Sequence, residues 1–465
     1  MITKTLKMAA LLVLMLFANI NLANAQTTPP AGTPVIELTT TSAGATVRMS
    51  MQAAVAGTRV WIQTAPNNYT PVTVGTDWTS STNYTPTGTS LKVYGNITGF
   101  NCSGTSTTIT PVSAINAIGN RSLQYLECYY NQLTSLEVGG LMQLRYLDCG
   151  HNQLTSLEVT GVGLMELLNL NCAYNQLTSL EIGGLQILKY LSCSNNLLTN
   201  LDLSERGLSQ LEYVSCGNNR LQNLTVLGLN NLQILSCSNN QLTYLNVQGL
   251  TQLQDLRCSN NLLTSLDVQS LTQLQNLRCS NNRLTSLDVS ELNQLKTLWC
   301  YGNPCTSSTS GLDQFYCQLP QKQASDGARI YVSAQAQADV EGFVLATNRA
   351  NANSKNWNLY GYYETTNIHY GITNTTGSYV CGTGIESVES TVSIYPNPVR
   401  DILNIKSDNT IESLELYDAL GRLVVRKNTV SDNISIDVSN LNNGIYILKL
   451  HTTNGIGRYK IVVGK

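Results

Sequence analysis

The chain has 465 residues, of which 42% are hydrophobic and 12% are charged, and its formal net charge is −2. Without a basic run or stripe it lacks the electrostatic footprint that nucleic acid or an anionic membrane requires, so neither is expected as a partner. Gly, Ser, Thr and Asn are abundant and Phe is scarce, which favours turn-rich, mainly β structure.

Residues 1–25 have the pattern of a secretory signal peptide. Lys4 and Lys7 precede an apolar run from Met8 to Ile20, and Ala23-Asn24-Ala25 supplies the small residues of a cleavage site before Gln26. The run is too short to span a membrane, and no later apolar run of roughly 18 residues occurs. We therefore expect an exported protein with no transmembrane segment.

Residues 26–90 begin with a Pro/Thr-rich linker and continue in short alternating runs, "VIELTT", "VRMSMQ" and "RVWIQT". Such runs predict short strands. We expect a β-rich N-terminal cap that shields the open end of the array that follows. An adhesive module of its own is the alternative interpretation.

A cysteine recurs through the middle of the chain every 21 residues, with two intervals of 23. Its frame is L-x-x-L-x-C-x-x-N-x-L-x-x-L-x-V, as in "LRCSNNLLTSLDV" from Leu256 to Val268. No single helix or strand fits this spacing, so each repeat is predicted to be one coil of a solenoid, whose short strand pairs in parallel with the next. The regular ladder positions are Cys128, Cys149, Cys172, Cys193, Cys216, Cys237, Cys258, Cys279 and Cys300, and a degenerate coil at "ITGFNC" adds Cys102 as a tenth.

Two columns of this frame are expected to be structural. The asparagine three residues after each cysteine is predicted to satisfy backbone groups of its own coil and of the next. Neighbouring strands lie about 4.8 Å apart, whereas a disulfide needs converging Cβ atoms at roughly 3.8 Å. The ladder cysteines are therefore expected to stay reduced, as small buried fillers.

Residues 123–304 resemble bacterial leucine-rich repeats, and the cysteine column resembles the cysteine-ladder subtype of internalin J-like surface proteins. The resemblance implies a solenoid, assigned to residues 91–304, whose parallel strands line a concave face.

The residues three before, one before and two after each ladder cysteine are called the concave face here. It is acidic and tyrosine-rich near the first coils, neutral in the middle, and basic near the last coils. Exposed tyrosines beside carboxylates suit protein or glycan contact, although tyrosine also packs well on a solvent-facing sheet. The run of asparagines two after cysteine, from residue 195 on, is read as a solvated turn column. The candidate ligand-binding residues are Tyr125, Glu127, Tyr130, Tyr146, Asp148, His151, Tyr174, Tyr190, Tyr213, Arg257, Arg278 and Trp299.

After Cys300 the frame fades, and residues 305–384 are predicted to form irregular C-terminal capping coils from a helix, a strand, a second helix and a second strand. Cys317 and Cys381 lie outside the ladder, and an oxidising compartment allows a disulfide between them. Cys305 takes an inward leucine slot and is expected to be a buried thiol.

Residues 385–465 alternate in strands joined by turn dipeptides, which predicts a separate immunoglobulin-like β-sandwich. They also resemble the C-terminal sorting domain of the type IX secretion system. This resemblance implies recognition by that secretion machinery, transport across an outer membrane, and an extracellular or surface-attached product. The residues that carry it are Tyr395, Pro396, Asn397, Pro398, Gly421, Gly444 and Tyr446.

The sequence offers little for catalysis. Only three histidines occur, His151, His369 and His451, and no metal-site, nucleophile or phosphate-loop motif is present. Glu127 and Asp148 could act as an acid–base pair, but adjacent coils of an open sheet provide no cleft that excludes water. No enzyme activity, cofactor or metal is expected.

The pattern predicts a mainly β protein, a solenoid between an N-terminal cap and a separate C-terminal β domain, and the two resemblances imply that these are a leucine-rich repeat solenoid and a sorting domain. The leading functional hypothesis is a surface-displayed, non-enzymatic protein that binds a protein or glycan through its concave face, in adhesion, host contact or biofilm formation. The alternatives are a scaffolding surface component without a dedicated ligand and, less favoured, a hydrolase with its site in residues 305–384.

Overall fold

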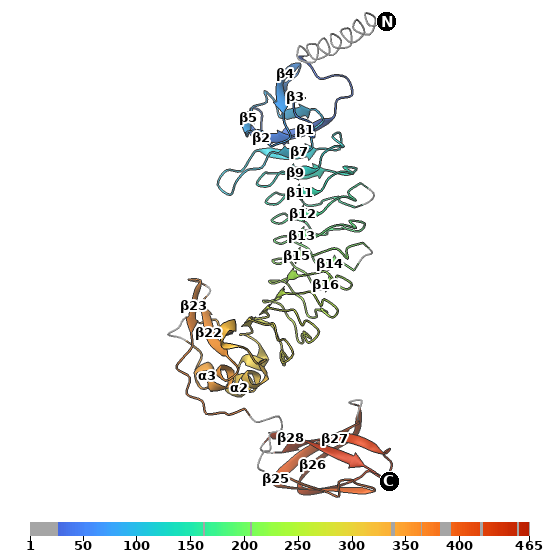
Figure 1. The fold of residues 1–465 in the computed structure, drawn as a ribbon, viewed down its shortest axis with the longest axis vertical. Coiled ribbons are helices and arrows are strands. Elements are labelled where there is room, and N and C mark those ends of the chain that lie inside the picture. The colour runs from blue at the N-terminus through green and yellow to red at the C-terminus, as the bar shows by residue number, and fades with distance from the viewer. Residues whose placement is uncertain are drawn as a thin grey trace, which may run out of the picture. The chain divides into compact units, whose positions relative to one another are not determined.

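The computed structural model describes residues 27–160, 163–204, 207–335, 340–363, 365–381, 392–418, 422–452 and 455–464. The predicted signal peptide lies outside them. The chain divides into two units, Met1–Tyr379 and Val380–Lys465 (Figure 1). Each unit has a hydrophobic core of its own, and each is described separately below.

The first unit is organised by one 15-stranded sheet, whose short strands follow one another along the repeats (Figure 1). The strands from β7 to β22 pair in parallel, and equivalent leucines face each other in register, as Leu126 and Leu147 do. The repeat strands, in sheet order, are β7 (Gly99–Asn101), β9 (Tyr125–Glu127), β11 (Tyr146–Asp148), β12 (Asn169–Asn171), β13 (Tyr190–Ser192), β15 (Tyr213–Ser215), β17 (Ile234–Ser236), β18 (Asp255–Arg257), β19 (Asn276–Arg278) and β20 (Thr297–Trp299).

The leucine columns of the repeat form the core. Within one coil Leu253, Leu256, Cys258 and Leu263 are all completely buried. At about 1.5–3 kcal/mol for each large side chain removed from water, this burial offsets the entropy lost in ordering the coil. On the opposite side of two coils, β14 (Asn200–Asp202) and β16 (Asn223–Thr225) pair as a small parallel sheet.

The asparagine column connects neighbouring coils, as Asn152 illustrates. Its Nδ2 donates to the carbonyls of Cys149 and Gly150 in its own coil and of Cys128 in the preceding coil, at 3.0–3.1 Å. Its Oδ1 accepts from the backbone N–H of Leu133 at 3.0 Å. The predicted structural role is therefore present. The amide points toward the preceding coil, however, so it bonds to backbone groups of that coil and not of the next one.

The N-terminal region covers the first edge of the solenoid. Strands β2 (Val47–Gln52) and β5 (Thr82–Tyr84) extend the long sheet in antiparallel fashion beyond β7. A second, six-stranded sheet has the order β10 (Ser135–Glu137), β8 (Val112–Asn116), β1 (Val35–Thr40), β6 (Ser90–Tyr94), β3 (Thr58–Ala65) and β4 (Asn68–Val74). Because β10 belongs to a repeat coil, the cap and the solenoid share both sheets.

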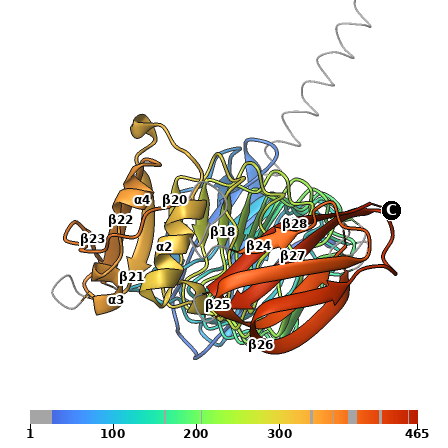
Figure 2. The same ribbon diagram turned by 90° about the horizontal axis from the view of Figure 1, so that it is seen from below.

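The other end of the long sheet continues through irregular coils. After η1 (Pro304–Thr306), α2 (Thr309–Gln318) and η2 (Ala324–Asp326), the strands β21 (Ala328–Ser333) and β22 (Trp357–Tyr363) add to β20 in parallel (Figure 2). The short helices α3 (Gly342–Leu345) and α4 (Ala350–Asn353) lie between them in sequence, and β23 (Ile368–Gly371) ends the sheet as a hairpin with β22. Trp357 is completely buried, and its Nε1 donates to the Pro320 carbonyl at 2.8 Å.

The second unit is an antiparallel β domain. Its five-stranded sheet has the order β24 (Ser393–Tyr395), β25 (Ile402–Tyr417), β27 (Gly444–Thr452) and β28 (Gly455–Val463), with β26 (Leu423–Asp437) paired to β25. An isolated parallel bridge joins Val399 to Val463. Leu403, Leu414 and Leu448 lie in its separate core.

Candidate binding surface

The strand registers place the predicted residues of the concave face in continuous columns. Tyr125, Tyr146 and Asn169 are in register on successive strands, as are Glu127, Asp148 and Asn171. Farther along, the rings of Tyr190 and Tyr213 stack with centroids 4.3 Å apart. Because the leucine and the cysteine of each strand point inward, the residues on either side of the leucine face outward.

Non-glycine residues that lie two positions after a ladder cysteine have a left-handed backbone. This conformation was not predicted from the sequence. The eight non-glycine members of this column have φ between 51° and 58°, namely Tyr130, His151, Tyr174, Asn195, Asn218, Asn239, Asn260 and Asn281. Asparagine tolerates this conformation better than other non-glycine residues, which explains the run. Its later amides also form a ladder, in which each Nδ2 donates to the preceding Oδ1 at 2.8 Å from Asn281 to Asn218.

At residues 130, 151 and 174 this column is aromatic, and a stack of rings takes the place of the amide ladder. The centroid of His151 lies 4.0 Å from that of Tyr130 and 4.0 Å from that of Tyr174, with interplanar angles of 18° and 11°. A side chain that is not Gly, Asn or Asp pays roughly 1–2 kcal/mol for a left-handed backbone. The aromatic stack of Tyr130, His151 and Tyr174 is thus held against the local backbone preference, on a surface where Tyr174 is 49% exposed.

Two carboxylates lie beside the aromatic stack. Burial raises the pKa of Glu127, and the charge of Asp148 raises it further. Burial also raises the pKa of Asp148, opposed by hydrogen bonds from the Gly150 N–H and the Asn171 amide. The pKa of His151 is lowered by burial, against the attraction of Asp148. The acidic end of the face is therefore partly desolvated.

The middle of the concave face contains a shallow hollow of about 390 Å³. Tyr174 bounds it at one end and Arg257 at the other. Small residues in the columns next to cysteine create the space, because a Gly, Ala or Ser there leaves the sheet uncovered. The polar groups that line it are those of Ser192, Ser194, Ser215, Ser236, Ser238, Asn195, Asn218 and Asn239.

The basic end differs from its sequence-based description. Arg257 forms a two-point ion pair with Asp255, with Nη2–Oδ2 at 2.8 Å and Nε–Oδ1 at 3.1 Å. Arg278 lies over the Trp299 ring, 5.0 Å from its centroid. Trp299 is only 8% exposed, so it is not an open contact residue.

Trp299 is covered by aromatic side chains that are not among the candidate ligand-binding residues. Tyr331 stacks on it at 4.2 Å, while Tyr362 and His369 of the β22–β23 hairpin contact it edge-on. His369 Nδ1 lies 3.1 Å from the Tyr331 hydroxyl. Tyr331 occupies the Trp299 column one strand later, in "RIYVS", so continuing the column past Cys300 would have found it.

The ladder cysteines are all completely buried and free. Burial raises their pKa, to about 12 for Cys102, Cys193 and Cys237, so no reactive thiolate forms at neutral pH. Cys305 is free and half-buried. Cys317 and Cys381 are both disulfide-bonded.

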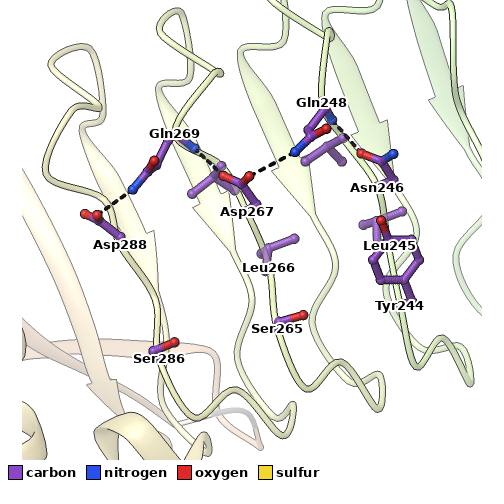
Figure 3. A pocket seen from close by; sticks show the side chains of 12 residues that line it. Tyr244, Leu245, Asn246, Gln248, Ser265, Leu266, Asp267, Gln269, Ser286 and Asp288 are labelled. Atoms are coloured by element: carbon purple, nitrogen blue, oxygen red, sulfur yellow. Dashed lines mark hydrogen bonds between the residues drawn. The ribbon is translucent and has the colours of Figure 1, made fainter. Parts of the chain in front are cut away.

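A second hollow, of about 370 Å³, lies on the side of the solenoid where the preceding coils carry β14 and β16, called the flank here; Figure 3 shows its lining residues. The carboxylates of Asp267 and Asp288 accept hydrogen bonds from Gln248 and Gln269 of the preceding coils, at 3.1 and 2.6 Å. Asp288 also accepts from the backbone N–H of Ser290 at 3.0 Å. These polar groups stabilise the coils, which leaves them little capacity for a ligand.

The sorting-motif residues occupy defined positions in the second unit. Asn397 joins the segment after β24 to the last strand: its Nδ2 donates to Lys460 O and its Oδ1 accepts from Val462 N, both at 2.8 Å. The peptide bonds before Pro396 and Pro398 are cis. Tyr446 is buried in β27, which Gly444 begins, whereas Tyr395 is exposed. Gly421 lies outside the described residues.

Two further findings concern the described residues alone. No group of three or more His, Cys, Asp or Glu side chains suited to a metal ion occurs in that part of the chain. None of its helices has the length and hydropathy needed to cross a membrane.

Two family models match segments of the chain. Residues 393–464 match the secretion system C-terminal sorting domain, and residues 272–314 match a pair of leucine-rich repeats. Among curated proteins, β-agarase D of Zobellia galactanivorans is 35% identical over 75 residues, which are 16% of this chain and 15% of that protein.

Solved structures with similar folds include two bacterial leucine-rich repeat proteins. The functional domain of InlJ from Listeria monocytogenes, which includes a cysteine ladder, is 20% identical with a TM-score of 0.46, over 80% of this chain and 93% of that one. YopM, a leucine-rich effector protein of Yersinia pestis, is 25% identical with a TM-score of 0.35, over 40% of this chain and 56% of that one.

The family models, the regular burial of ten cysteines and the parallel sheet agree with one another. The first unit is therefore a parallel solenoid with a buried cysteine ladder that contains leucine-rich repeats at residues 272–314, and the sorting domain at residues 393–464 indicates type IX secretion to the cell surface or the extracellular space.

Proposed function

We propose that the chain is a non-enzymatic recognition protein that binds a protein or glycan outside the cell through its concave face, in adhesion, host contact or biofilm formation. The observation that carries the proposal is the aromatic stack. Three stacked aromatic residues occupy left-handed positions that Asn195, Asn218, Asn239, Asn260 and Asn281 fill in later coils, although asparagine tolerates this backbone better. A ligand that uses the rings accounts for the retained strain.

The surroundings of the stack support a binding role. Rings of Tyr and His provide apolar contact area at small entropic cost, together with groups that donate and accept hydrogen bonds. The stack lies beside the partly buried carboxylates, on the same coils, and its Tyr174 borders the hollow, so a ligand that crosses several strands meets all three.

The test replaces the three rings of the stack by asparagine, the residue that occupies the same column in the later coils. The Tyr130→Asn, His151→Asn, Tyr174→Asn triple variant of residues 26–465 keeps the left-handed backbone, so we expect it to fold at least as stably. Labelled protein is incubated with intact bacterial cells and with epithelial cells, and the retained label is measured by flow cytometry. We expect retention of the triple variant to fall by about tenfold or more.

Tyr244→Ser is the matched control. Tyr244 is 64% exposed, lines the flank hollow, and occupies a position that is serine in the following coils. It removes an exposed ring without touching the concave face, so retention should not change. Equal retention of the wild type and the folded triple variant would favour the scaffolding alternative.

A further inference from the structure

We infer that the hollow between Tyr174 and Arg257 holds a neutral oligosaccharide segment, with one sugar packed against the exposed part of the Tyr174 ring. This inference rests on the proposed function and names the ligand class of its site. The hollow extends across the neighbouring strands β12, β13, β15, β17 and β18. At the usual interstrand spacing of about 4.8 Å it is roughly 19 Å long, which suits an extended chain of several sugars.

The hollow offers hydrogen-bonding groups that the fold leaves unused. Ser194 and Ser215 pair with each other at 2.7 Å. Among the described residues, the side chains of Ser236, Ser238 and Asn195 make no hydrogen bond, although all three line the hollow. Hydroxyls and amides both donate and accept, which matches the mixed donors and acceptors of sugar hydroxyls.

Tyr174 supplies an apolar ring at the end of the hollow, next to the serine and asparagine side chains that line it. His151 covers one face of its ring at 4.0 Å, and no second ring stacks on the other face within the described residues. The ring is 49% exposed and borders the hollow. The C–H face of a pyranose can pack on such a ring while its hydroxyls point toward the serines and amides.

The charges of the concave face favour a neutral ligand. In the part of the chain that the structure describes, Arg257 is the charged side chain that lines the hollow, and Asp255 already holds it at 2.8 Å. Beyond Tyr174 lie the carboxylates of Glu127 and Asp148, which repel anionic polymers. An acidic polysaccharide therefore finds no free cation in the hollow.

A peptide ligand fits the lining less well. Protein partners are held by aromatic and aliphatic anchors that enter apolar pockets. The hollow has Ala173 and the Tyr174 ring as its apolar lining, next to a row of serines and asparagines. Polar ligands that match these groups lose fewer hydrogen bonds on leaving water.

The test is affinity electrophoresis of residues 26–465 in native gels that contain one polysaccharide each. The neutral arms are laminarin, amylose, agarose and galactomannan, and the acidic arms are polygalacturonate and heparin. We expect retardation by at least one neutral polymer and none by the acidic ones. Retardation by the acidic polymers alone, or by no polymer, would overturn the inference.

Variants tie the retardation to the hollow. Tyr174→Asn removes the ring but keeps a residue type suited to the left-handed backbone, and it should raise the dissociation constant about tenfold or more. Tyr174→Phe keeps the ring and should bind within roughly threefold of the wild type. Tyr244→Ser should bind as the wild type does. Equal affinity of all variants would place the sugar elsewhere and contradict the inference.

A last arm separates this inference from the proposed function. Target cells are treated with periodate, which cleaves vicinal diols of sugars, or with protease. If retention depends on the aromatic stack but is lost only with protease, the concave face binds a protein and the oligosaccharide is wrong. If retention never depends on the stack, the proposed function itself fails.

Discussion

At the scale of single residues, the thiols of the ladder differ in a way that the repeat pattern does not show. Those of Cys128, Cys149, Cys279 and Cys300 donate to a carbonyl of the next coil at 3.4–3.7 Å. Within the described residues, the Cys258 thiol has no such partner. A Cys→Ser substitution should therefore change the free energy of unfolding by different amounts at different positions of the ladder.

Cys258→Ser should lower the free energy of unfolding by about 1–3 kcal/mol, because the hydroxyl is buried without a partner. Cys258→Ala should lower the free energy of unfolding by a smaller amount, since it removes the sulfur without adding a polar group. Urea denaturation followed by circular dichroism gives both values. Cys128→Ser is the control: its hydroxyl inherits the Asp148 carbonyl, so a loss as large as that of Cys258→Ser would contradict this account.

Asp148 predicts a pH dependence of stability. Burial raises its folded pKa above the unfolded value of about 3.9, so the folded state binds the proton more tightly. Stability from this group is gained as pH falls through the raised pKa, and lost as pH rises through the same window. Asp148→Asn removes the dependence, so it should stabilise the protein more at pH 7 than at pH 4.

Melting temperatures of the wild type and Asp148→Asn between pH 4 and 8 measure this difference. We expect the advantage of the variant to grow as the pH rises. Asp267→Asn is the matched control: its carboxylate is exposed on the flank, so its curve should run parallel to that of the wild type. An advantage of Asp148→Asn that stays constant with pH would show that its charge is not the cause.

At the scale of one coil, the asparagine three residues after cysteine is the main connection to the preceding coil. Asn261 donates to the carbonyls of Cys237, Cys258 and Ser259 and accepts from the Leu242 N–H, all at 3.0–3.3 Å. Asn261→Ala leaves these buried groups unpaired, so it should lower the free energy of unfolding by at least about 3 kcal/mol. Urea denaturation measures this loss.

The neighbouring Asn260 provides the control for that measurement. It has a left-handed backbone and is exposed, with an amide that bonds to Asn239 at 2.8 Å. Asn260→Gly keeps the backbone conformation and loses bonds that water replaces, so it should cost less than about 1 kcal/mol. If both variants lost similar amounts of stability, the asparagines three residues after cysteine would not be the main connection between neighbouring coils.

The sequence predicted the elements whose residues repeat and missed those set by contacts between distant segments. The strand, the inward leucines, the buried cysteines and the asparagine column follow from one period. The left-handed column showed only as an asparagine run, because the aromatic residues at 130, 151 and 174 hide the backbone preference. That Trp299 is buried could not be foreseen, since Tyr362 and His369 reach it from a hairpin more than one coil away.

At the scale of the whole molecule, the two units divide two tasks. The repeat unit carries the candidate binding surface, and the C-terminal unit matches the sorting domain over residues 393–464. The sorting domain has its own core, so it should act on another cargo.

Fusion of residues 385–465 to an exported carrier should bring the carrier to the surface or the medium of a bacterium with the type IX system. Immunoblots of medium, surface and periplasm measure the distribution. Asn397→Ala loses both bonds to the last strand, so a smaller share of the fusion should be exported. The carrier without these residues is the baseline, and periplasmic retention of the intact fusion would contradict the prediction.

The cysteine ladder also places one chemical reporter in each coil. A buried thiol reacts with an alkylating reagent only when its coil opens, so the labelling rate of each cysteine, read by mass spectrometry, gives the opening equilibrium of that coil. In a solenoid, where each coil contacts only its neighbours, these rates would show whether the array frays from its ends or opens as one block. Cys102 to Cys300 thus record the cooperativity of the array without any engineered probe.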